Sequence, residues 1–203
     1  MVRIGLMVLG LFGCSPAVAG TLYGADIAED LTLTASVGYP DAEVGVRVPL
    51  TPAIDIQPRL QIGFGRALST RCCSLGVLAD GRFRLAEFKK TTLSATTTVG
   101  VVVPLTEGSP VGVPLLWPGV QASVHLMDLL TVELGFQAQT TLFVGGDGLL
   151  FNLFLAPNAG ISLPLTDDVE LGLRVDLGPD LYLGERTVAL GHLRGVLGMS
   201  YRF

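Results

Sequence analysis

Charge is scarce in this chain, and the sequence contains no basic cluster. Only 15% of the 203 residues are charged, whereas about 25% is usual in a soluble domain. Lys and Arg number 13 and Asp and Glu 18, which gives a formal net charge of −5. A nucleic-acid-binding protein needs a basic surface to neutralise phosphates, so this balance excludes that class of partner. A hydrophobic fraction of 49% excludes disorder.

The sequence also lacks an apolar run that is suited to a membrane-spanning helix. The stretches 108–127 and 148–166 are free of Asp, Glu, Lys and Arg, but prolines interrupt both of them. Proline removes a backbone hydrogen bond and breaks a helix, so we expect neither stretch to cross a bilayer as a helix. With helices removed, a closed β-barrel is the structure that pairs every backbone group within lipid.

Cysteine is rare, with three residues at Cys14, Cys72 and Cys73. The adjacent pair lacks the C-x-x-C spacing of a zinc site, and phosphate-binding loops and haem motifs are absent as well. We therefore expect no metal and no cofactor. In an oxidising compartment, Cys72 and Cys73 are either two loop thiols or a strained vicinal disulfide.

The first residues have the layout of an export signal. Arg3 precedes a short apolar stretch, and Ala17-Val18-Ala19 supplies small residues at the two recognition positions. We expect residues 1–19 to be a cleaved signal peptide and residues 20–29 to form an N-terminal periplasmic segment. The alternative is lipidation of Cys14, because Leu11-Phe12-Gly13-Cys14 resembles a bacterial lipobox. Either route exports the chain.

Alternation of apolar and polar residues predicts β-strands, because successive side chains of a strand point to opposite faces. The alternation is clearest over 54–65, 130–142 and 169–178. Further strands are expected at 31–39, 42–50, 76–87, 92–103, 119–127, 149–163 and 187–203. We predict an all-β fold, a closed antiparallel transmembrane barrel of about ten strands over residues 30–203.

The connections between these strands alternate in length, as they do in outer-membrane barrels. Short turns are expected near 49–53, 88–91, 128–130 and 165–167, and the longest connections at 66–75, 104–118 and 179–186. A hydrophobe-Pro-Leu-Thr strand ending recurs at Pro49, Pro104 and Pro164, but Pro104 falls at the opposite end from the other two. A barrel of eight strands is therefore the alternative.

The last strand ends on an aromatic residue, with Met199, Tyr201 and Phe203 on its apolar face. This ending resembles the terminal strand of bacterial outer-membrane β-barrel proteins. The resemblance implies an outer-membrane location, contact with lipid and lipopolysaccharide, and recognition of these three residues by the barrel-assembly machinery. It carries no activity motif. A soluble lipocalin-type barrel is the structural alternative, and it would place its apolar residues inside.

If the apolar face contacts lipid, the lumen receives most of the arginine side chains of the mature protein, together with several carboxylates. Arginine and carboxylate groups pair bidentately, and an isolated buried charge is costly, so we expect an ion-pair network. We expect His125 opposite Glu133, and Arg194 within reach of Glu170 or Asp176. The predicted lumen set is Arg47, Asp55, Arg59, Asp80, Arg82, Arg84, His125, Glu133, Glu170, Arg174, Asp176, His192, Arg194 and Arg202.

We expect a non-enzymatic barrel with one of two roles. Small barrels fill their interiors with side chains, which favours a structural role. An arginine surplus, with inward glycines such as Gly45, Gly135 and Gly160 leaving room, favours a narrow anion passage. The third hypothesis is a membrane-barrel hydrolase or protease. Its candidate residues are Ser123, His125 and Glu133, or Asp176 with His192.

Overall fold

The structure is a computed structural model that describes residues 24–64, 74–105, 111–126, 129–145, 148–183 and 188–203. The predicted signal peptide, Cys14 and the Cys72–Cys73 pair lie outside these residues. The strands are β1 (Thr32–Tyr39), β2 (Asp41–Thr51), β3 (Ile54–Gly63), β4 (Ser74–Phe88), β5 (Thr91–Pro104), β6 (Val111–Pro114), β7 (Gly119–Leu126), β8 (Leu130–Gly145), β9 (Gly148–Pro164), β10 (Val169–Leu183) and β11 (Val188–Arg202). The described part of the chain holds no helix long and apolar enough to cross a membrane.

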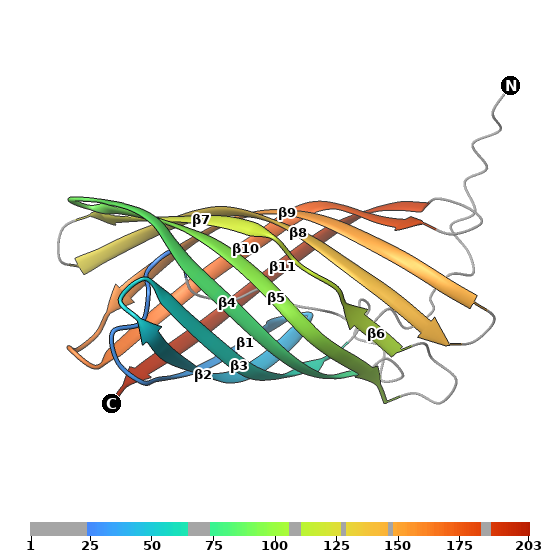
Figure 1. Cartoon of the computed structure of the whole chain (residues 1–203), viewed down its shortest axis with the longest axis horizontal. Coiled ribbons are helices and arrows are strands. Elements are labelled where there is room, and N and C mark those ends of the chain that lie inside the picture. Colours follow the sequence, from blue (N-terminus) through green and yellow to red (C-terminus); the bar gives the residue numbers. More distant parts are fainter. Residues whose placement is uncertain (1–23, 65–73, 106–110, 127–128, 146–147, 184–187) are drawn as a thin grey trace, which may run out of the picture.

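The strands form a closed antiparallel barrel (Figure 1). Successive strands pair with one another, and β1 pairs with β11 from Thr32↔Arg202 to Tyr39↔Gly195, which closes the ring. Because β6 and β7 both pair with β5 and β8, they occupy one position, and the described strands make a ten-position ring. The predicted fold and strand number are confirmed, and the eight-strand alternative is wrong.

The strand at the sixth position is interrupted at residues 115–118, and the sequence prediction missed its first part. Pro114 and Pro118 flank the interruption, and proline cannot donate a ladder hydrogen bond. The backbone is held there by other contacts: Trp117 N donates to Thr98 O at 3.2 Å, and Trp117 Nε1 donates to Thr140 O at 2.8 Å. β6 therefore lies within what the sequence predicted to be a long connection.

The two ends of the barrel differ in their connections. The turns β2–β3, β4–β5 and β9–β10 lie at one end, where Phe203 N also donates to Leu31 O at 3.1 Å. We call this the turn end. The β1–β2 turn and the strand ends that flank 65–73, 106–110, 146–147 and 184–187 lie at the other, which we call the loop end. Pro104 lies at the loop end, opposite Pro49 and Pro164, as the ten-strand arrangement requires.

The distribution of polarity is inverted relative to a soluble barrel. Leu134 is 52% exposed and Leu173 46%, whereas the side chains of Arg59 and Arg194 are 0% and 2% exposed. Within the described residues, every charged residue that is classed as exposed lies at the turn end. These residues are Glu29, Asp30, Glu87, Lys89, Lys90, Asp167, Asp168 and Arg202. The lipocalin-type alternative is therefore wrong, since it requires the apolar face inside.

The N-terminal residues differ from the expectation of a separate periplasmic segment. Within the predicted segment 20–29, residues 24–28 lie inside the barrel, where Ala25 is 0%, Ile27 9% and Ala28 8% exposed. The segment is not a strand, so its backbone groups lack ladder partners. Polar side chains of the lumen supply those partners instead. No local pattern in residues 24–28 predicts that they lie inside the barrel.

Candidate functional site

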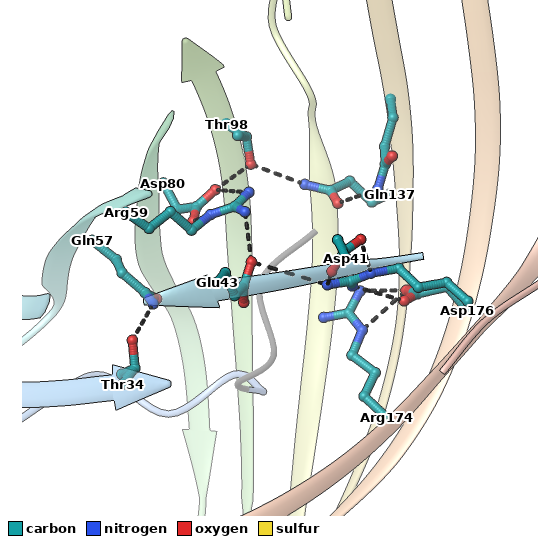
Figure 2. Close-up of polar contacts among 12 residues, drawn as sticks. Thr34, Asp41, Glu43, Gln57, Arg59, Asp80, Thr98, Gln137, Arg174 and Asp176 are labelled. Carbon is teal, nitrogen blue, oxygen red and sulfur yellow. Dashed lines mark hydrogen bonds and ion pairs between the residues drawn. The ribbon is translucent and has the colours of Figure 1, made fainter. Parts of the chain in front are cut away.

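The lumen holds an ion-pair layer built around Arg194, and its partners Asp41 and Asp176 are labelled in Figure 2. Arg194 Nε and Nη2 each donate to the carboxylate of Asp41 at 3.1 Å, and Nη1 donates to Asp176 Oδ2 at 3.1 Å. Arg174 Nη2 donates to the other oxygen of Asp176 at 2.7 Å. These contacts join β2, β10 and β11 across the point of barrel closure, so the layer helps to hold the ring shut.

A second cluster surrounds Arg59 on the neighbouring wall. Arg59 Nη1 donates to Glu43 Oε2 at 2.7 Å, and Nε donates to Asp80 Oδ2 at 2.6 Å. Thr98 donates its hydroxyl to Asp80, and Gln137 Nε2 donates to Thr98 Oγ1 at 3.3 Å. Glu43 lies 4.0 Å from Arg194 and connects the two clusters. We refer to both together as the central layer.

The central layer is packed rather than wet. The side chains of Asp176 and Arg174 are 0% and 2% exposed, so water does not reach them from either end. Polar side chains occupy the space that the inward-facing glycines were expected to leave. A Cβ added to Gly45 would lie 2.8 Å from Arg59 Cβ, and one added to Gly135 would lie 2.1 Å from Gln121 Oε1. The glycines make room for polar side chains and leave no passage at these positions.

An apolar layer lies between the central layer and the loop end. It consists of Leu78, Val102, Trp117, Phe143 and Phe154, each no more than 5% exposed. Leu78, Val102, Phe143 and Phe154 share the inward face of their strands with buried polar residues, and Trp117 lies in the interruption at 115–118. Sequence alternation missed them because it assigned every apolar residue to lipid. Their packing closes the lumen by dispersion and exclusion of water instead of by ion pairs.

The third layer lies toward the turn end and contains Arg47, Asp55 and Arg82. Arg47 Nη2 lies 2.6 Å and Arg82 Nε 3.6 Å from the Asp55 carboxylate. Arg82 Nη1 also donates to Gly24 O at 2.9 Å. Below this layer a cavity of about 490 Å³ opens at the turn end, with Glu170, His125 and Arg84 among its lining residues.

The predicted lumen residues separate into two groups in the structure. Buried in the layers or beside them are Arg47, Asp55, Arg59, Asp80, Arg82, Glu133, Arg174, Asp176 and Arg194. At the mouth of the turn end lie Arg84, His125, Glu170 and Arg202. For His192 the structure gives the backbone position alone, opposite Gly178.

Two of the predicted pairings can be compared with the strand register. Asp176 stands opposite Arg194, and their side chains are in contact, as expected for one of the two partners named for Arg194. The expected pairing of His125 with Glu133 is wrong. His125 lies opposite Thr131, and Ser123 lies opposite Glu133, because the β7–β8 pairing begins at Leu126↔Leu130, so the turn is centred one residue earlier than the predicted turn at 128–130.

Arg84 also differs from its predicted place. A register shift between Arg84 and Ala86 turns the end of β4. As a result, the Arg84 side chain pairs with Glu87 and donates to Pro52 O at the rim, where it is 29% exposed. It is a residue of the mouth and takes no part in the buried layers.

Sequence reasoning missed three lumen carboxylates: Asp41, Glu43 and Asp180. Asp180 is 2% exposed and accepts a hydrogen bond from Asn152. The sequence did contain a signal for Asp41 and Glu43. Both lie an even number of positions from Arg47 on β2, so their side chains point to the same face as that of Arg47.

Ser123, His125 and Glu133 do not assemble into a catalytic trio, and the side chain of His192, the candidate partner of Asp176, lies outside the described residues. Ser123 is 0% exposed, and its Oγ accepts a hydrogen bond from Ala25 N at 2.7 Å. The His125 ring lies 3.0 Å from Thr131 Oγ1 and 3.2 Å from Asp26 Oδ1. Nucleophile and base are therefore each engaged elsewhere. Within the described ranges, no group of three or more His, Cys, Asp or Glu side chains is arranged to hold a metal ion.

Comparison with known proteins found similar chains among solved structures alone. No protein-family model matches the chain, and no curated protein matches it. Three solved structures illustrate the likeness. The KdgM porin is 9% identical, with 86% of this chain and 99% of that chain covered and a TM-score of 0.48. An outer-membrane channel from Pseudomonas putida F1 is 14% identical, with 92% and 100% covered and a TM-score of 0.45.

The third of these structures is an enzyme, the outer-membrane protease OmpT from Escherichia coli. It is 6% identical, with 85% of this chain and 93% of that chain covered and a TM-score of 0.42. A porin, a channel and a protease thus share this architecture, so the likeness extends to the fold and favours no one activity.

Proposed function

We propose that this chain spans a bacterial outer membrane as a closed, non-enzymatic barrel, with its turn end in the periplasm and a structural role. One observation carries the proposal. The side chains of Arg47, Arg59, Arg82, Arg174 and Arg194 are each paired with carboxylates and no more than 10% exposed. Arginines that lined a working passage would present their guanidinium groups to water and to the solute.

The membrane location rests on the outer surface. Apolar side chains such as Val37, Leu60 and Leu177 are 50% or more exposed, while the exposed charges of the described chain lie at the turn end. A charge on the lipid face of a barrel is destabilising, most of all near the middle of the bilayer. The outer surface therefore suits hydrocarbon, and we propose lipid and lipopolysaccharide as its surroundings.

A narrow passage is the second candidate, and the structure changes the ion that it would favour. Five arginines in the described lumen (Arg47, Arg59, Arg82, Arg174, Arg194) face seven buried carboxylates (Asp41, Glu43, Asp55, Asp80, Glu133, Asp176, Asp180). An excess of carboxylate attracts cations. Any state that opened this lumen is therefore expected to favour cations, in contrast to the anion preference inferred from sequence.

The test is conductance of the purified protein in planar bilayers. We expect no steady current from the wild type, because the central layer and the apolar layer both exclude water. The variant Arg194→Ala removes the guanidinium that joins three carboxylates, and it should give an intermittent cation-selective current. The control variant Arg84→Ala, at the rim, should give no current. If the wild type gave a steady current, and this current changed in Arg174→Ala, the structural role would be wrong and the barrel would be a passage.

Enzymatic activity would contradict the proposal in a different way. Turnover of lipid A or of a peptide by the purified barrel, lost in His125→Ala or His192→Ala, would assign the protein to the class of membrane-barrel enzymes. We expect no such turnover.

Assembly is expected to depend on the terminal aromatic residue. Met199, Tyr201 and Phe203 are 49%, 42% and 69% exposed on the outer face of the closing strand, and the Tyr201 and Phe203 rings meet edge to face at 5.1 Å. We expect Phe203→Asp to reduce the folded, heat-modifiable form in membrane fractions, because the assembly machinery would no longer recognise the terminus.

A matched control for this variant is Phe88→Asp, which also places a charge on an exposed aromatic at the turn end but outside the terminal strand. It should assemble normally. Equal yields of folded Phe203→Asp and Phe88→Asp would show that the terminus is no assembly signal.

A further inference from the structure

Residues 24–28 lie in the turn-end half of the lumen, held almost entirely through their backbone. Ala25 N donates to Ser123 Oγ at 2.7 Å, and Ala25 O accepts the Ser94 hydroxyl. Ala28 N donates to Asp55 Oδ2 at 2.8 Å. These partners come from β3, β5 and β7, so the segment links the paired strands β5 and β7 to β3, which pairs with neither of them.

Two arginines of the wall also bind this backbone. Arg82 Nη1 donates to Gly24 O at 2.9 Å and to Asp26 O at 3.3 Å, and Arg47 donates to Asp26 O. The segment thus supplies carbonyl acceptors to two buried guanidinium groups, each of which has a carboxylate partner in Asp55. Charge-assisted bonds of this kind are stronger than neutral ones.

The fit selects small side chains. A Cβ added to Gly24 would lie 2.5 Å from Ser123 Oγ and 2.7 Å from Glu133 Cδ. Ala25 is fully enclosed, so a larger residue at that position has no space. Because the wall contacts backbone N–H and C=O groups, it recognises a short peptide with small residues at these positions and depends little on its other side chains.

The segment also separates the buried layers from the cavity of about 490 Å³ at the mouth. Gly24, Asp26, Ile27 and Ala28 are themselves part of the cavity lining. Ser94 and Ser123, which lie behind the segment, are both 0% exposed. Removing the segment would extend the cavity to these two hydroxyl groups and to Arg82.

We propose that residues 24–28 are an intramolecular plug. They occupy a peptide-binding site that is formed by Arg47, Asp55, Arg82, Ser94 and Ser123, and this site accepts the same peptide in trans when the plug is deleted. The proposal concerns the turn-end half of the lumen. It is independent of conduction, because the central layer closes the barrel separately.

The experiment measures labelling of an introduced thiol by a membrane-impermeant maleimide, in a background with Cys72 and Cys73 changed to Ser. Ser94→Cys should be protected in the full-length barrel and should lose this protection when residues 24–28 are deleted. Two controls accompany it. Thr98→Cys, in the central layer, should stay protected in both forms, and Thr166→Cys, in the exposed β9–β10 turn, should be labelled in both.

A synthetic peptide of residues 21–29 tests recognition. Added to the deleted barrel, it should restore protection of Ser94→Cys, and a peptide with Trp in place of Ala25 should not. In the full-length chain, Ala25→Trp should expose Ser94→Cys as the deletion does.

Three results would overturn the proposal. The first is equal labelling of Ser94→Cys with and without residues 24–28. The second is loss of protection at Thr98→Cys after the deletion, since the segment would then be part of the barrel's packing and not a plug. The third is the same protection from both peptides. A current in planar bilayers would bear on the structural role alone and would leave these thiol results unchanged.

Discussion

Arg194→Met is expected to lower the free energy of unfolding by about 3–5 kcal/mol, because it removes one partner of a buried ion pair and leaves the other charged. Arg194 gives two hydrogen bonds to Asp41 and one to Asp176, and its side chain is 2% exposed. Asp176 keeps Arg174, so most of the cost arises at Asp41. Urea titration of the barrel in lipid vesicles, followed by tryptophan fluorescence, measures the change.

Two comparisons isolate the cause. Arg84→Met breaks the rim pair with Glu87, whose side chains are 29% and 59% exposed. An exposed pair contributes about 0–1 kcal/mol, so this variant should remain close to the wild type. Adding Asp41→Asn to Arg194→Met removes the orphaned charge and should recover part of the loss. Equal effects of Arg194→Met and Arg84→Met would show that the central layer does not stabilise the barrel.

Leu134→Arg is expected to lower the free energy of unfolding in the membrane by about 2–4 kcal/mol, as charges do on the lipid face of a barrel. Leu134 is 52% exposed on β8, and its backbone neighbours across the ladders are Ala122 and Ala159. None of these outward positions offers a carboxylate partner to the new guanidinium group. The same urea titration in vesicles measures the cost.

Leu165→Arg is the matched control, because Leu165 is 59% exposed at the turn end, beside Asp167 and Asp168. There the cost should fall to about 0–1 kcal/mol, as it does near a membrane interface. Leu134→Ala separates loss of the leucine side chain from gain of a charge. If Leu134→Arg and Leu165→Arg unfolded at the same urea concentration, the apolar band would not be in hydrocarbon.

The sequence by itself determined the strands and the faces that they present. Period-two alternation places Arg59 and Asp80 on one face and Leu134 and Leu173 on the other, and the exposure of the side chains in the folded barrel shows that the apolar face is outside. This information is local, because the pleat of a strand relates each residue to its own neighbours. The faces of each strand can therefore be predicted from the sequence without knowing how the strands close into a barrel.

The tertiary structure decided which inward groups meet. Arg194 binds Asp41, a residue 153 positions away, because β1 and β11 close the barrel. No local period encodes that closure. The shift at Arg84 moved a predicted lumen residue to the rim, and the position of the β7–β8 turn, one residue earlier than predicted, separated His125 from Glu133. Residues 24–28 have no alternation, so only the unpaired polar groups of the assembled lumen could show where they bind.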